Sequence, residues 1–235
     1  MNRFYKGILL VFLVSLFFTR NVYAWERHSD TTLLLGFRGG INLSRTSIGG
    51  ISTGSLMTKN YNFILSLHFM QEITFHSGFG FHQKGFVINK AYTDIYNNPI
   101  GNHPTYERFS YFNIPITLQY NLGRKKFNVY LCGGLDFNFL ISQLSTADLP
   151  EFYNNNRVEP FEESLKDNFV SLGIGYHAGI GMEYKIFPAL QVFADARFYN
   201  DFINNYKYIS LPELKHRYYS ISLGMRIGIP IKFNV

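Results

Sequence analysis

The residues of this chain best suited to chemistry are charged side chains on segments whose pattern otherwise predicts strands. They are two acids and three arginines from four separate segments: Arg38, Glu183, Asp195, Arg197 and Arg226. Arginine and carboxylate groups form strong, often bidentate hydrogen bonds. A buried charge has to be paired in this way, because an unpaired one costs several kcal/mol. We therefore expect one structural cluster of charges in the interior, and the functional alternative is a path for protons or ions.

Histidine and cysteine do not predict a metal site. His76 and His82 share a face of one predicted strand, but six residues at about 3.3 Å each place them about 20 Å apart. The remaining histidines that we considered lie on different segments without zinc-site spacing: His68, His177 and His216. Cys132 is the single cysteine, which excludes an internal disulfide framework. We expect Cys132 to fill space, and we expect no metal and no cofactor.

Catalysis would need a nucleophile or a water-activating group with its base. The candidates are single carboxylates in one long polar segment: Asp148, Glu151 and Glu159. Isolated acids in such a segment are more often simply hydrated. Gly39-Gly40 and Gly49-Gly50 are typical of strands and turns and do not form a phosphate-binding loop. The sequence therefore predicts no catalytic and no cofactor-binding residue, and a protein that is not an enzyme.

The segments that carry these side chains alternate apolar residues with small or polar ones. Between Phe127 and Ser142, the odd positions are mostly apolar, whereas even positions include Asn128, Cys132 and Asp136. A strand sends successive side chains to opposite faces, so this segment has one apolar and one polar face. It runs longer than the roughly 9–11 residues that a strand needs to cross a bilayer. Eight such segments are predicted: 33–44, 61–70, 73–88, 107–121, 126–142, 168–185, 189–200 and 216–233.

The connections between these segments alternate between long and short. The long ones are 45–60, 89–106, 143–167 and 201–215, and the short ones are 71–72, 122–125 and 186–188. Barrels of the bacterial outer membrane have short periplasmic turns and longer extracellular loops. The sequence thus predicts an all-β fold, an eight-stranded antiparallel transmembrane β-barrel with short periplasmic turns and long extracellular loops. Residues on its apolar face are expected to contact lipid: Ile174, Ile180, Leu223 and Ile227.

The first 24 residues are predicted to be a secretory signal peptide that is cleaved after Ala24, which leaves 25–235 as the barrel domain. Arg3 and Lys6 precede the apolar stretch 7–18, and that stretch is shorter than the roughly 20 residues of a membrane-spanning helix. Removal of this segment takes away three basic residues and no acid, so the formal net charge falls from +6 to +3. Such a modest charge, without a Lys/Arg run, predicts no binding to nucleic acid.

Several stretches resemble the PorT-type outer-membrane β-barrel family of Bacteroidetes. The longest is 110–123, Ser-Tyr-Phe-Asn-Ile-Pro-Ile-Thr-Leu-Gln-Tyr-Asn-Leu-Gly, followed by Phe-Asn-Val-Tyr-Leu-Cys-Gly-Gly at 127–134. Shorter stretches carry the same likeness: 83–86, 179–184 and 194–199. The resemblance covers nearly all of the mature chain and implies an eight-stranded barrel. It also implies a part in protein export, because the family's namesake belongs to the type IX secretion route.

Three functions follow as hypotheses. The first is a non-enzymatic structural or interaction barrel in the outer membrane of the cell envelope, whose loops or periplasmic rim engage a macromolecule such as a secretion-system protein. The second is a narrow outer-membrane pore for small solutes. The third is a soluble exported ligand binder of lipocalin type, with an apolar cavity. For the interaction barrel, the expected partners are outer-membrane lipid and, during biogenesis, the barrel-assembly machinery. The apolar run to Val235 resembles the C-terminal signal that this machinery recognises.

Overall fold

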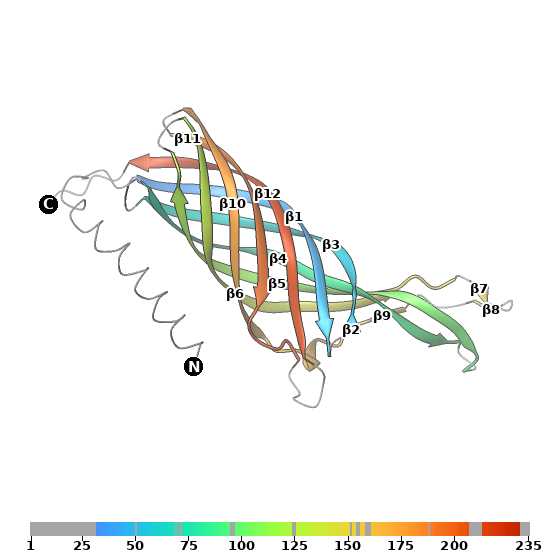
Figure 1. Ribbon diagram of the computed structural model, residues 1–235. Coiled ribbons are helices and arrows are strands. Elements are labelled where there is room, and N and C mark those ends of the chain that lie inside the picture. The colour runs from blue at the N-terminus through green and yellow to red at the C-terminus, as the bar shows by residue number, and fades with distance from the viewer. Residues whose placement is uncertain are drawn as a thin grey trace, which may run out of the picture.

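The computed structural model is a tall ring of antiparallel strands (Figure 1). It describes residues 32–49, 51–68, 70, 72–94, 97–123, 126–150, 152–153, 156–157, 161–187, 189–206 and 213–230. The predicted signal peptide 1–24, its cleavage after Ala24 and the final residues 231–235 lie outside the described residues. Within the described part of the chain, no helix has both the length and the hydropathy to span a bilayer.

Eight long strands form the wall: β1 (Thr32–Ile48), β3 (Gly54–His68), β4 (Ile73–Thr93), β5 (Pro99–Asn121), β6 (Phe127–Ala147), β10 (Leu172–Phe187), β11 (Leu190–Asp201) and β12 (Leu214–Pro230). Each pairs with the next along the chain, and β12 pairs with β1, so the ring is closed. Closure leaves no unpaired edge in the ring itself, which is the condition for strands to cross hydrocarbon. The predicted fold class is confirmed.

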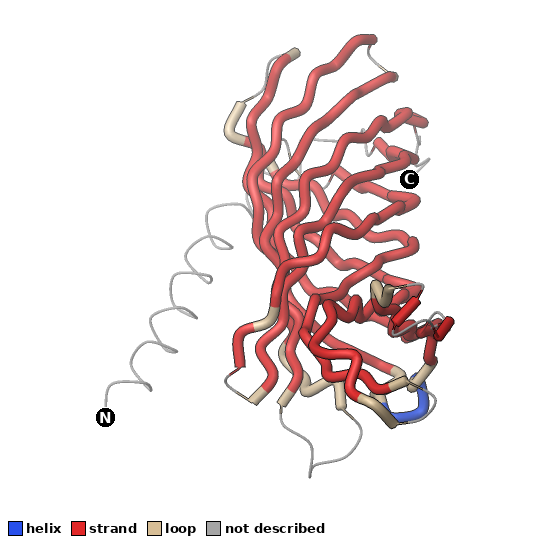
Figure 2. Tube along the Cα trace, turned by 90° about the vertical axis from the view of Figure 1, so that its right-hand side faces the viewer, coloured by secondary structure: helices blue, strands red, loops and turns tan. Residues whose placement is uncertain are grey.

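Smaller elements lie at one end of this ring. They are β2 (Ile51–Ser52), β7 (Phe152–Tyr153), β8 (Asn156–Arg157), β9 (Phe161–Glu163) and the short 3₁₀ helix η2 (Lys166–Asn168). Figure 2 shows that strand makes up almost the whole wall and that η2 sits among the connections at one end. We call the end with connections 69–72, 122–126 and 188–189 the turn end, and the opposite end the loop end.

Two of the predicted long loops are largely strand. β1 continues to Ile48 and β3 begins at Gly54, while β4 and β5 leave only residues 94–98 between them. The alternation of apolar and polar residues marks a strand only where one of its faces contacts an apolar environment. Beyond that zone no face has to be uniformly apolar, so the pairing continues although the pattern stops. As a result β4 and β5 run well past the rest of the ring at the loop end (Figure 1).

A β-bulge in β6 explains why its alternation stops at Ser142. Ser110 pairs with Ser142 but the next residue, Tyr111, pairs with Leu140, so Ile141 is an extra residue. Ile141 and Ser142 are both exposed, and the inward face changes from even to odd positions, with Gln143 buried. A bulge of this kind re-aims the side chains that follow it.

The wall is inside out relative to a soluble protein. Its outward face is mostly apolar, and its buried residues are mostly polar or charged. Ile180, Leu223 and Ile227 are 52%, 67% and 53% exposed, and Ile174 lies on the same outward face of β10 and is partly exposed. Apolar residues normally occupy the interior of a protein. This distribution therefore requires a lipid surrounding, and it is the reverse of what a soluble lipocalin-type binder would need.

Candidate functional site

Asp195 on β11 accepts hydrogen bonds from two side chains in the middle of the barrel and forms an ion pair with a third. Arg197 donates a hydrogen bond from Nη2 to Asp195 Oδ2 at 2.8 Å, and Nη1 of Arg38 lies 3.7 Å from the same oxygen. The Tyr130 hydroxyl also donates to this oxygen at 3.4 Å. All four residues are buried. Gly181 makes this possible, because a Cβ there would lie 2.3 Å from the Tyr130 ring.

A second buried ion pair lies beside the first group. Arg226 donates from Nη2 to Glu183 Oε2 at 2.7 Å. Glu183 also accepts hydrogen bonds from Gln119 and Asn128, each at 3.2 Å, and the Arg226 guanidinium lies 4.6 Å from the centre of the Phe193 ring. The carboxylate is thus satisfied by one charged and two neutral donors, as a buried charge requires.

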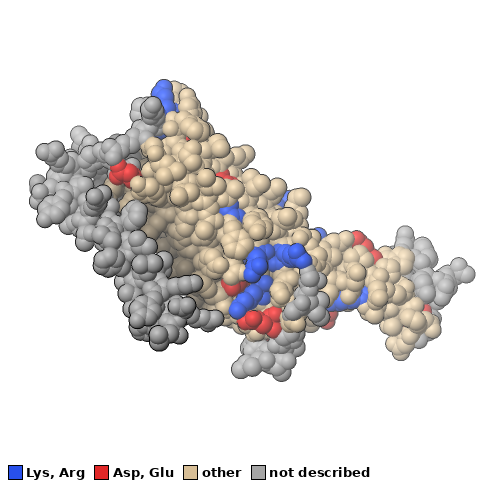
Figure 3. All heavy atoms as spheres, in the orientation of Figure 1, with Lys and Arg blue, Asp and Glu red and all other residues tan. Residues whose placement is uncertain are grey.

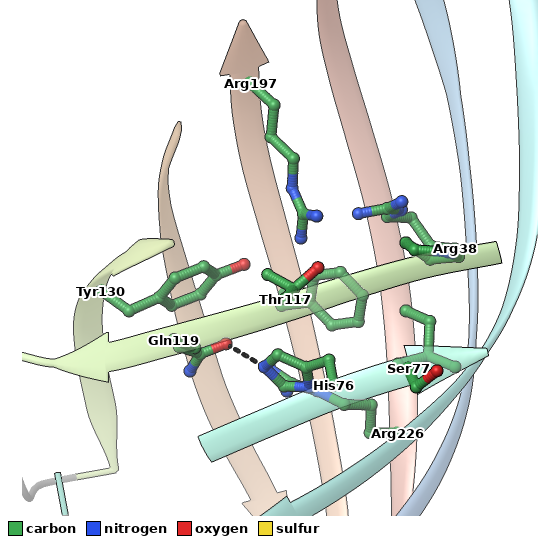
Figure 4. A pocket seen from close by; sticks show the side chains of 11 residues that line it. Arg38, His76, Ser77, Thr117, Gln119, Tyr130, Arg197 and Arg226 are labelled. Atoms are coloured by element: carbon green, nitrogen blue, oxygen red, sulfur yellow. Dashed lines mark hydrogen bonds between the residues drawn. The ribbon is translucent and has the colours of Figure 1, made fainter. Parts of the chain in front are cut away.

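The five charged residues named from the sequence therefore form two groups rather than one. Arg38, Arg197 and Arg226 line the same cavity, together with Tyr130 and Gln119 (Figure 4). Its volume is about 20 Å³. That is room for about one water molecule. The interior at this level is filled by side chains.

Lys84 and Asp201 form an ion pair that the sequence reading missed. Their side chains are 2.7 Å apart and both are buried, and Lys84 Nζ lies 4.9 Å and 5.5 Å from the ring centres of Tyr111 and Tyr218. The signal for Lys84 was available, because it shares the even, inward face of its strand with His82. Asp201 gave no signal, since it falls in the segment predicted as a loop.

Asp136 forms the other missed pair, with His177. His177 Nδ1 and Asp136 Oδ2 are 2.5 Å apart, and His177 Nε2 lies 3.0 Å from the Thr117 hydroxyl. Asp136 also accepts from Asn113 at 3.2 Å. The even face of segment 126–142 was identified as polar, but its contact with His177 depends on the register between β6 and the neighbouring strand β10, which places Asp136 opposite Gly175.

An apolar cluster closes the lumen towards the loop end. Its buried members are Phe86, Phe109, Tyr111, Leu140, Phe169 and Leu214. Phe109 and Phe169 meet edge to face, with their ring centres 4.8 Å apart, and Tyr206 stacks on Phe169 at 5.1 Å. Phe169 and Tyr206 belong to the connections after β6 and β11, so these two connections fold inward over the barrel. We call this cluster the loop-end plug.

The remaining candidates stay apart from one another. His76 bonds to Ser66 and Gln119, and His82 bonds to Tyr218, so the two histidines lie in different networks. The other histidines also have separate partners: His68 with Thr74, and His216 with Thr46. No group of three possible metal ligands occurs among the residues that the structure describes.

Asp148 and Cys132 are the two remaining candidates that the structure describes. Asp148 accepts a hydrogen bond from the Tyr106 hydroxyl at 2.9 Å. Glu151 and Glu159 lie outside the described residues. Cys132 is a buried free thiol on the inward face of β6.

A family model described as "Outer membrane protein beta-barrel domain" matches residues 26–207 of the chain. Comparison with solved structures finds a major outer membrane protein from Thermus thermophilus, with 11% identity, coverage of 84% of this chain and 99% of that chain, and a TM-score of 0.49. Neisserial surface protein A gives 14% identity, 85% and 97% coverage and a TM-score of 0.45. Ail of Yersinia pestis gives 13% identity, coverage of 85% of this chain and 100% of that chain, and a TM-score of 0.40. The comparison with curated protein sequences found no match.

Proposed function

This chain belongs to the outer membrane protein beta-barrel domain family, and from that premise we propose that it is a sealed, non-enzymatic barrel that carries a rigid interaction sheet on the cell surface. The observation that carries the proposal is the length of β4, β5 and β6, which continue past the closed ring at the loop end. With the loop end outside the cell, this extension is the part of the molecule that a partner reaches first.

The extension has its own pairing. β3 pairs with β4 no further than Val87, and β10 pairs with β6 no further than Phe139. Beyond these points, β4 and β5 stay paired to Thr93, and β5 and β6 stay paired to Ala147, where β9 adds a short further strand. From Val87 to Thr93 this is about 20 Å of strand at roughly 3.4 Å per residue. We call these paired ends of β4, β5, β6 and β9 the outer sheet.

Side chains hold the outer sheet together. Lys90 and Glu107 form an ion pair at 2.6 Å, and the Tyr92 and Thr105 hydroxyls are 2.7 Å apart. The Tyr92 ring packs edge to face on Phe161 of β9, with ring centres 5.1 Å apart. A surface that is ordered before binding loses less conformational entropy when a partner binds. Its ordering therefore favours a role in recognition.

The lumen supports the view that the barrel is not a conduit. The cavity beside Arg38, Arg197 and Arg226 is about 20 Å³, and the loop-end plug lies between it and the loop end. An eight-stranded barrel is only just wide enough for its own side chains. The paired charges then stabilise the fold, and the narrow pore becomes the alternative that conductance measurements decide.

The concrete form of the proposal is an accessory role in protein secretion of the type IX kind, which rests on the PorT-like stretches at 110–123 and 127–134. Deletion of the gene should leave secretion cargo in the periplasm, and the wild-type gene should restore its export. Normal export in the deletion strain would refute the secretion role.

A shortened variant separates the outer sheet from the barrel. Ile88 and Thr105 are directly opposite in the ladder, so residues 89–104 can be replaced by an Asn-Gly turn without a change of register. We expect this variant to assemble, as judged by heat-modifiable migration on a gel, and to fail to restore export. Full restoration by the shortened variant would show that the outer sheet is not the interaction surface.

A further inference from the structure

Three basic residues gather on the outward face of β1 and β12, at the loop end. Arg45 and Arg217 are direct partners in the ladder, and both are exposed. Lys215 lies two residues before Arg217, on the same face of β12. Figure 3 shows Lys and Arg side chains gathered on this part of the wall. We call Arg45, Lys215 and Arg217 the basic cluster.

The pairing of Arg45 with Arg217 is unfavourable for the sheet alone, because like charges directly opposite on neighbouring strands destabilise it. Lys215 has an acid beside it, Glu213, whose carboxylate is 2.6 Å from Lys215 Nζ. Arg217 Nε also donates to Asn200 Oδ1 at 3.3 Å. Cations gathered in this way make the local potential more positive, which attracts an anion.

The basic cluster stands at the border of the apolar band. Leu43 is the preceding outward residue on β1, and Tyr219 is the next outward residue on β12; they are 53% and 61% exposed. Arg45 is two residues beyond Leu43, or about 7 Å along the strand. Its guanidinium is therefore at the depth where lipid headgroups begin, with hydrocarbon against Leu43 and Tyr219.

A groove extends from the basic cluster to the apolar surface at Leu43 and Tyr219. It has a volume of about 1140 Å³, and its lining includes the basic cluster and the apolar side chains of Leu43, Phe202 and Tyr219. Two acids also line it, and each is paired with a lysine: Asp201 with Lys84, and Glu213 with Lys215. A ligand that fills it needs an anionic head and an apolar body. Arginine is suited to the head, because its planar guanidinium binds phosphate oxygens in a bidentate manner.

We propose that the basic cluster and its groove bind the phosphorylated headgroup of a lipid in the outer leaflet, whose acyl chains lie along Leu43 and Tyr219. The basic cluster lies on the outward face of β1 and β12 and takes no part in the outer sheet, so the site goes beyond the proposed function and shares with it only the placement of the loop end outside. A lipid held there would fix the height and tilt of the barrel beneath the outer sheet.

The test uses the purified full-length protein in zwitterionic detergent micelles, titrated with diphosphorylated lipid A and, in parallel, with its dephosphorylated form. We expect saturable binding of the phosphorylated lipid alone. The double variant R45Q/R217Q should weaken binding by about tenfold or more, while K126Q, which removes an exposed cation at the turn end, should bind like the wild type.

Three results would overturn the proposal: equal binding of the dephosphorylated lipid, unchanged binding by R45Q/R217Q, or equal loss in K126Q. A titration with inorganic phosphate tests whether the bound anion must belong to a lipid. An affinity for inorganic phosphate comparable to that for diphosphorylated lipid A would also refute the assignment to a lipid. Should R45Q/R217Q fail to assemble, R217Q and the comparison of the two lipids on the wild type still decide the matter. None of these readouts depends on secretion.

Discussion

Replacement of Glu183 by glutamine tests the ion pair with Arg226 inside the barrel. The side chain keeps its shape and can still accept from Gln119 or Asn128, but the charge that neutralises Arg226 is lost. Both members of the pair are almost completely buried. The guanidinium would then remain inside the barrel without its counter-ion.

The expected loss follows from the distance and the burial. Two unit charges about 4 Å apart attract by about 4 kcal/mol at an effective dielectric constant of about 20. Removal of one member of a buried pair costs about 3–5 kcal/mol in measured cases. We therefore expect E183Q to lower the free energy of unfolding by about 3–5 kcal/mol. The double variant E183Q/R226M should recover much of this loss, because it leaves no unpaired charge.

Urea unfolding of the refolded protein in detergent measures these free energies. The control is E213Q, which breaks the Lys215–Glu213 pair of nearly equal length, 2.6 Å, on the exposed face. Exposed pairs of this kind are worth about 0.2–1 kcal/mol. A loss below about 1 kcal/mol for E183Q, or losses that simply add in the double variant, would refute the view that this pair is a buried, mutually dependent unit.

Three further predictions concern the wall and the lumen. Leu223→Arg should cost about 2–4 kcal/mol because it puts a charge on the lipid-facing surface; normal heat-modifiable migration of this variant would contradict the face assignment. Gly181→Ala should cost about 1–3 kcal/mol through overpacking, since the new Cβ meets the Tyr130 ring, and an unchanged urea midpoint would count against that contact. Planar-bilayer recordings of the purified protein should show no regular conductance; stable, uniform steps would favour the pore instead.

The sequence predicted the wall well because each crossing strand has one face in an apolar solvent. Segments 126–142 and 168–185 carried this signal in full, and the structure pairs them along most of their length. The outer parts of β4 and β5 were missed for the same reason: where water replaces lipid, exposed residues such as Asn89 and Asn102 break the alternation of apolar and polar positions. The alternation of apolar and polar residues therefore marks the part of a strand that crosses the membrane, and it does not show where the strand ends.

The sequence indicated which charged side chains lie in the interior, but not which of them pair with one another. Arg38, Arg197 and Arg226 were expected in the interior, and the structure buries all three, but the pattern does not say which carboxylate each one meets. Arg197 meets Asp195 on its own strand, whereas Arg38 and Arg226 each reach a carboxylate two strands away. Asp201 could not be found because its strand ends there, outside the alternating zone. The loop-end plug was missed because the sequence predicted a strand from residue 168, whereas β10 begins at Leu172, so that Phe169 lies on the connection that folds inward.

The ladder between β1 and β12 has a consequence for how the molecule is made. It joins the earliest and the latest strands of the described chain along their whole length, from Thr32 opposite Pro230 to Ile48 opposite Leu214. Until β12 has been synthesised, β1 has no neighbour on that side, and contacts so distant in sequence form slowly. Before this last pairing forms, a sheet of the other strands would have two unpaired edges, and such edges can pair with other chains; closure of the ring removes both at once.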